Sequence, residues 1–126
     1  MANNINDFKT YEGVDVEKFN GQKVKIQEIL VEDEKEFEYN GEKKVSKKFV
    51  VMTEPVSQDP EIRVREWFNM SRKDDSWVIP TNSGSNAGKL LAYFNVEHPS
   101  ELLGKEVQVI LRVGKDDRKF LGFHYG

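Results

Sequence analysis

One stretch of the chain is predicted to form a helix, and strand-like segments lie on both sides of it. This stretch, residues 81–96, reads TNSGSNAGKLLAYFNV. Its apolar residues recur at helical spacing, at Ala87, Leu90, Leu91 and Phe94. Ser83 or Ser85 fits the N-cap, and we expect the helix to stop near Asn95. A lone helix among strands is either a functional element or a cover for one end of a β structure.

The segments around the helix alternate apolar and polar residues, as half-buried strands do. We expect strands or hairpins in residues 13–32, 32–56, 61–71, 105–113 and 119–125. Residues 55–60 and 72–85 are expected to be loops. In the first segment the alternation blurs at Ile29 and Val31, which predicts a bulge or a bend.

Residues 32–48 are expected to project from the domain as a charged ribbon. Asn40-Gly41 is a strong signal for the tight type I′ turn of a hairpin. Phe37 and Tyr39 alternate with glutamates before this turn, and the segment has too few apolar residues to bury a face. Exposed aromatics of this kind can stack on bases, or they can pair across the hairpin and pack on the domain.

The order of elements is that of the OB fold, in which a helix between strands 3 and 4 closes one end of a five-stranded Greek-key barrel. We therefore predict an all-β chain with one helix, folded as such a barrel with a long hairpin between strands 1 and 2. The chain resembles OB-fold single-stranded DNA-binding proteins of the small phage and archaeal kind over residues 14–125. The resemblance lies in SNAGKLLAYFNV, PSELLGKEVQVILRV and RKFLGFHY, and it implies binding of single-stranded nucleic acid.

The 126 residues fit one domain, and we expect a flexible N-terminal leader over residues 1–13 before a single OB-fold domain over residues 14–126. There is no apolar run of roughly 20 residues and no secretory signal, so we expect a cytoplasmic protein with no membrane partner. Cysteine is absent, and His98 and His124 lack the spacing of metal ligands. We predict no metal and no cofactor.

The excess of basic residues lies in the middle of the chain. The net charge is −3, yet residues 41–73 carry 8 basic and 5 acidic side chains. A site for single-stranded nucleic acid needs two things: aromatic side chains on which bases stack, and basic side chains along the path of the phosphate backbone. Both occur in this part, at Trp67 and the basic residues around it. Together with the neighbouring aromatics they define a predicted nucleic-acid site at Phe37, Tyr39, Lys44, Lys48, Arg63, Arg65, Trp67, Arg72, Lys73 and Trp77.

The centre of this predicted site is the outward phase of residues 61–71, at Arg63, Arg65 and Trp67. Two alternatives remain open. The arginines can be an ordinary solvated face, and Trp67 can be covered by the ribbon or by the loop that holds Trp77. Asp74 and Asp75 also lower the positive potential of that loop.

The sequence lacks the motifs of nucleotide-cradling loops and of catalysis. TNSGSNAGK has neither G-x-G-x-x-G nor G-x-x-x-x-G-K-[ST], so its glycines are expected to form a flexible approach to a capped helix. Glu66 is the one carboxylate set in an apolar run, where it can mark a bulge. We predict no catalytic residue and no enzyme activity.

These observations predict non-catalytic binding of single-stranded nucleic acid, DNA in preference to RNA, with little sequence specificity and a role in DNA replication or repair. The alternative is an OB-fold protein-interaction module or assembly subunit. Its ribbon of residues 32–48 would add to a partner's sheet or exchange with a second copy of the chain. A third reading is a small hydrolase or nuclease, which metal-dependent turnover would reveal.

Overall fold

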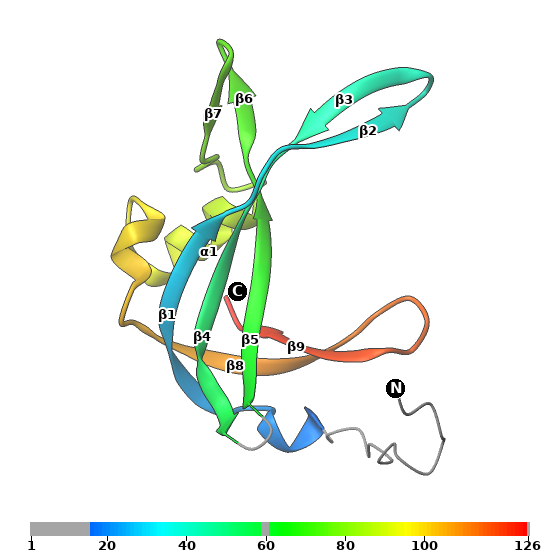
Figure 1. Ribbon diagram of the computed structural model, residues 1–126. Coiled ribbons are helices and arrows are strands. Elements are labelled where there is room, and N and C mark those ends of the chain that lie inside the picture. The colour runs from blue at the N-terminus through cyan, green and yellow to red at the C-terminus, as the bar shows by residue number, and fades with distance from the viewer. Residues whose placement is uncertain (1–15, 59–60, 126) are drawn as a thin grey trace, which may run out of the picture.

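The computed structural model describes residues 16–58 and 61–125 (Figure 1). The expected leader, residues 1–13, lies outside the described residues. The strands are β1 (Lys23–Val31), β2 (Lys35–Tyr39), β3 (Glu42–Ser46), β4 (Lys48–Gln58), β5 (Glu61–Asn69), β6 (Ser71–Lys73), β7 (Ser76–Val78), β8 (Glu106–Val113) and β9 (Lys119–Phe123). The helices are α1 (Asn86–Phe94) and two 3-10 helices, Val16–Phe19 and Pro99–Leu102.

The main sheet is antiparallel and has five strands in the order β5-β4-β1-β8-β9. It curves so strongly that its two outer strands, β5 and β9, approach each other (Figure 1). No ladder of backbone hydrogen bonds joins these two strands within the described chain, so the predicted closed barrel is not observed. The structure confirms a mostly β chain with one short helix.

Two hairpins stand apart from the main sheet and rise from the same end of it (Figure 1). The first, β2–β3, is the predicted ribbon, and positive φ angles of 53° at Asn40 and 77° at Gly41 fit its predicted type I′ turn. The second, β6–β7, was predicted to be loop. Its turn is made by Asp74 and Asp75, which both have positive φ.

The position of α1 in the strand order and the length of β4 differ from the prediction. Helix α1 follows the seventh strand instead of the third, because the two hairpins add four strands that the prediction left out of the count. Strand β4 continues through Pro55 to Gln58, where a loop was predicted. The register of β4 against β5 shifts on both sides of Pro55, which is how a strand accommodates a residue without an N–H.

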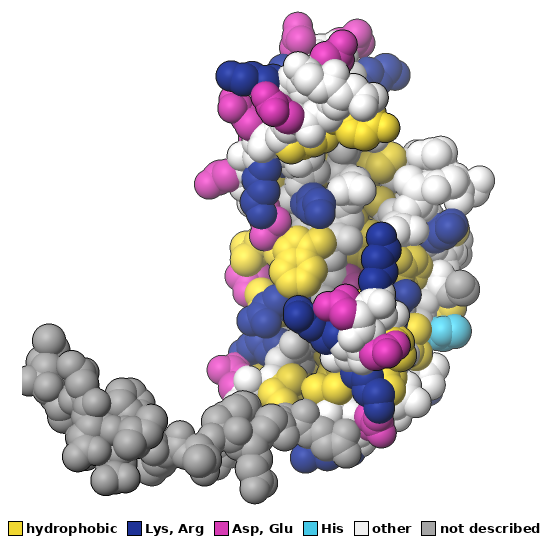
Figure 2. Space-filling model, turned by 90° about the vertical axis from the view of Figure 1, so that its right-hand side faces the viewer, with side chains coloured by type: hydrophobic (Ala, Val, Ile, Leu, Met, Phe, Trp, Pro, Cys, Tyr) yellow, Lys and Arg dark blue, Asp and Glu magenta, His cyan; other side chains and the backbone are white. Residues whose placement is uncertain are grey.

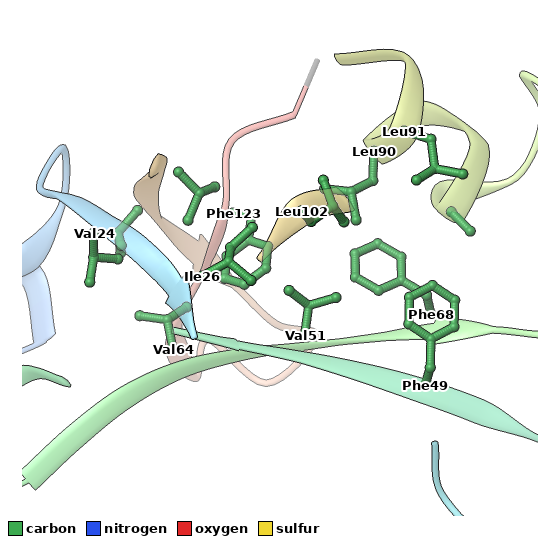
Figure 3. Packing of buried hydrophobic residues seen from close by; sticks show 13 residues of the cluster. Val24, Ile26, Phe49, Val51, Val64, Phe68, Leu90, Leu91, Leu102 and Phe123 are labelled. Carbon is green, nitrogen blue, oxygen red and sulfur yellow. The ribbon is translucent and has the colours of Figure 1, made fainter. Parts of the chain in front are cut away.

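The core fills the concave side of the sheet (Figure 3). Alternate residues of β1, β4 and β5 point into it, among them Ile26, Val51, Val64 and Phe68. The rings of Phe49 and Phe68 stack with 5.3 Å between centroids. Strand β1 carries a bulge, as predicted, but the bulge lies before Ile29, because the register of β1 against β4 shifts between Ile26 and Glu28.

Helix α1 covers one end of this core. Ala87, Leu90 and Leu91 are buried there, which confirms the apolar stripe. Ser85 is the N-cap and accepts a hydrogen bond of 2.9 Å from the Gly88 N–H, and Asn95 ends the helix in the left-handed region. None of the described helices has the length and apolar character needed to cross a membrane.

Candidate nucleic-acid interface

The convex face of the sheet carries a short apolar row across three neighbouring strands. Cross-strand pairing aligns Leu30 of β1 with Val50 of β4, and Val50 with Trp67 of β5. Paired residues point to the same face of a sheet, so the three side chains adjoin. Trp67 is 50% exposed and Leu30 is 45% exposed, whereas Val50 is buried between them. Trp67 is therefore a solvent-facing aromatic platform, not a core residue.

Cations flank this row on both sides. Arg65 lies two residues before Trp67 on the same face and pairs with Met52, and Lys48 pairs with Asn69 just beyond. Arg65 and Lys48 are both exposed, and neither forms an ion pair with the residues that the structure describes. Figure 2 looks onto the side of β5 and shows hydrophobic side chains with Lys and Arg close around them.

Arg63 is on the same strand, but its guanidinium is occupied by neighbouring groups. It forms an ion pair with Glu61 at 2.7 Å, donates to the carbonyl of Thr53 at 3.3 Å and also donates to Gln27. These bonds cross from β5 over β4 to β1. Arg63 therefore braces the sheet, and Arg65 is the better exposed arginine of the pair that the sequence singled out.

Two glutamates that were not predicted as site residues accept hydrogen bonds from the two tryptophans. Trp67 donates its indole N–H to Glu32 Oε2 at 3.1 Å, and Trp77 donates its indole N–H to Glu34. Both glutamates lie in the connection between β1 and β2. Because Glu32 and Glu34 sit in an acidic run of ordinary composition, the sequence offered no signal that distinguished them from solvated charge.

The β6–β7 hairpin brings Arg72 and Trp77 together. They are cross-strand partners, and the guanidinium lies 5.6 Å from the indole centroid, within the range of a cation–π contact. Arg72 also lies 3.9 Å from Asp75. Lys73 is exposed beside them. The hydrogen bond from Trp77 to Glu34 joins this hairpin to the base of the β2–β3 ribbon.

The β2–β3 ribbon presents a mixed aromatic and basic face. Phe37 pairs with Lys44 across the ribbon, and Tyr39 shares their face, with Lys44 Nζ 5.1 Å from its ring centroid. Phe37 is 44% exposed and Tyr39 is 59% exposed, so neither packs into the core. Glu36 and Glu38 point to the opposite face.

The predicted site residues therefore fall into three groups: the convex face along β5 and β4, and the two hairpins, β6–β7 and β2–β3, that rise from one end of the sheet. Comparison of the chain with models of protein families, with curated proteins and with solved structures found no significant match.

The remaining candidates have structural partners. Glu66 shows no bulge and points inward, where it accepts a hydrogen bond from Phe123 N at 3.0 Å and lies 3.0 Å from Arg112. Its burial raises the pKa of the carboxyl, while the Phe123 N–H and the Arg112 charge act in the opposite direction. His98 caps the 3-10 helix Pro99–Leu102. Over the described ranges, no three metal-ligating side chains cluster.

Proposed function

We propose that this protein binds single-stranded nucleic acid, DNA in preference to RNA, without catalysis and with little sequence specificity overall. The observation that carries the proposal is Trp67, which is half exposed on the outer strand β5 and is flanked on the convex face by Arg65 and Lys48. Stacking of a base on an aromatic ring contributes about 1–3 kcal/mol, and it tolerates any sequence because every base has a π face.

The topology of the main sheet supports the proposal. If the two hairpins are set aside, the chain order is β1, β4, β5, α1, β8, β9, with the helix between the third and fourth strands of the sheet. We infer an OB-type barrel that is left open between β5 and β9. In OB folds the face of the second and third strands, together with the loop that joins the first two, binds oligonucleotides. Here these elements are β4, β5 and the β2–β3 ribbon.

The positions of the basic and aromatic side chains indicate how a nucleic-acid strand would lie across this surface. Phosphates would meet Arg65 and Lys48 on the sheet, with Arg72, Lys73 and Lys44 on the two hairpins. Bases would stack on Trp67, with Trp77, Phe37 and Tyr39 further along. The whole chain carries a net charge of −3, which disfavours binding of a polyanion outside this region.

The proposal is tested by fluorescence anisotropy of a labelled dT oligomer. Trp67→Ala should weaken binding about five- to 150-fold, because one stacked base is lost. Arg65→Ala should weaken binding less and reduce its salt dependence, which is about −0.7 per neutralised phosphate in a plot of log affinity against log salt. Lys105→Ala, which removes one positive charge before β8, is the matched control. Unchanged affinity in both site variants contradicts the assignment.

The β2–β3 ribbon favours a second candidate function, a protein-interaction or assembly module. The ribbon is a separate two-stranded sheet, and among the described strands β2 and β3 pair only with each other. Such a ribbon can add a strand to a partner. Measurement of the solution mass over a range of protein concentrations tests the self-association form of this function. A constant monomer mass contradicts it.

A further inference from the structure

A polar hollow lies beside Trp67, between the end of β5 and the start of α1. Its volume is about 450 Å³, within the usual range of about 300–1,000 Å³ for small-molecule sites. The residues that line it include Trp67 and, from the two sides of the hollow, Asn69, Ser71, Asn82, Ser85 and Asn86. The hollow therefore adjoins Trp67, the most exposed aromatic residue of the main sheet.

The chemistry of the lining is neutral and rich in hydrogen-bonding groups. None of the lining residues is Lys, Arg, Asp, Glu or His. The side-chain amides of Asn69, Asn82 and Asn86 make no hydrogen bond to any described residue. Each amide offers two donors and one acceptor. Ser85 is already used, because its hydroxyl caps α1 and lies 2.9 Å from the carbonyl of Asn82.

We propose that this hollow binds one unstacked nucleobase of the strand. The base would lie against Trp67, and its Watson–Crick edge would exchange hydrogen bonds with the amides of Asn69, Asn82 and Asn86. This inference rests on the proposed function and deepens it, because it adds one base-selective position to an otherwise nonspecific interface. Single-stranded segments are read in this way when a splayed base stacks on an aromatic ring and pairs along its edge.

The surroundings favour a base over other neutral ligands. A phosphate would find no cation in the lining, whereas Lys48, opposite Asn69, and Arg65, two residues from Trp67, flank the hollow on the same face. A nucleotide would thus place its base in the neutral cavity and its phosphates on the cations outside. A neutral sugar could stack on Trp67 as well, but it would leave those flanking cations without a partner.

Base selectivity is tested with labelled dA, dC and dT homo-oligomers of equal length. The wild-type protein should prefer one of them. Asn69→Ala and Asn86→Ala should each weaken binding of the preferred oligomer about two- to tenfold, the range for one lost hydrogen bond. The difference in affinity between the preferred oligomer and the other two should therefore decrease. Gln58→Ala removes an exposed amide outside the hollow and should change nothing. The melting temperature of each variant checks that the fold is intact.

The other outcomes separate this inference from the proposed function. If the three oligomers bind equally well to the wild type and the asparagine variants, while Trp67→Ala weakens all of them, the hollow reads no base and the proposed function stands. If the wild type binds none of them at low salt, both fail. If instead a maltooligosaccharide binds and Asn86→Ala abolishes that binding, the hollow is a sugar site and the base assignment is overturned.

Discussion

Glu66 and Arg112 form an ion pair of 3.0 Å at the place where β5 and β9 meet without backbone pairing. The same carboxyl accepts from Phe123 N, and Arg112 Nη2 donates to Phe123 O at 2.7 Å. Both backbone groups of Phe123 are therefore satisfied by side chains. Gly122 leaves the space for this, because a Cβ there would lie 2.6 Å from Glu66 Oε1. The ion pair substitutes for the strand pairing that would close the sheet.

Comparison of the wild type with Glu66→Gln measures how the Glu66 carboxyl contributes to stability at different pH values. Burial raises the pKa of Glu66 in the folded protein, so the folded state holds this proton more tightly than the unfolded chain does. The Glu66 contribution to stability is then fully present below the unfolded value, about pH 4.3. It is lost as the pH rises through the higher folded pKa. The free energy of unfolding of the wild type, minus that of Glu66→Gln, should therefore fall with rising pH.

This difference is measured by urea unfolding at a series of pH values, with circular dichroism to check the fold of the variant. A difference that rises with pH would contradict the expectation. In that case the attraction of Arg112 outweighs the burial of the carboxyl.

Gly88→Ala should destabilise the protein by about 1–3 kcal/mol, the usual cost of forcing a methyl group into a packed site. A Cβ at this position would lie 2.8 Å from the carbonyl carbon of Asn82 and 2.9 Å from Ser85 Oγ. Backbone lies on one side and the helix cap on the other, so the site has little room to adjust. Denaturant unfolding gives the sign directly, since an unobstructed helical Gly→Ala change would instead stabilise the protein by up to about 1 kcal/mol.

Glu32→Gln should strengthen binding of a dT oligomer up to about fivefold at low salt. The change removes a negative charge beside the proposed phosphate path, an effect of about 0.2–1 kcal/mol for an exposed pair. The glutamine oxygen can still accept the Trp67 N–H, so the ring keeps its support. Glu38→Gln also removes one negative charge, on the face of the ribbon opposite Phe37 and Tyr39, and serves as the control. Weaker binding by Glu32→Gln alone would show that the carboxylate charge itself is needed to hold the ring.

Local signals in the sequence were sufficient to predict much of the fold and the exposure of the residues at the centre of the proposed site. Alternation placed Val64 and Phe68 inside and Arg65 and Trp67 outside, as observed. Asn40-Gly41 predicted the ribbon turn because those residue types readily adopt positive φ. Asp74-Asp75 makes a similar turn. Aspartates also occur in ordinary loops, so the β6–β7 hairpin was missed.

Contacts between distant parts of the chain account for what the sequence did not reveal. The Glu66–Arg112 pair and the hydrogen bond from Trp67 to Glu32 depend on strand pairing and on the curvature of the sheet. The hollow beside Trp67 is likewise formed by β5 and the start of α1, which are joined by a hairpin and a loop. The same glycine-containing loop that fails as a phosphate motif is thus part of the proposed base pocket.

The most direct test of the central claim is a fluorescence titration of the Trp77→Phe variant with a dT oligomer at two salt concentrations. Trp67 is then the only tryptophan, since the chain has two. We expect saturating oligomer to quench the emission of Trp67 and the affinity to fall at the higher salt concentration, because stacking and phosphate contacts act together at this ring. Emission that does not change at saturating oligomer would contradict the claim that Trp67 is the binding platform.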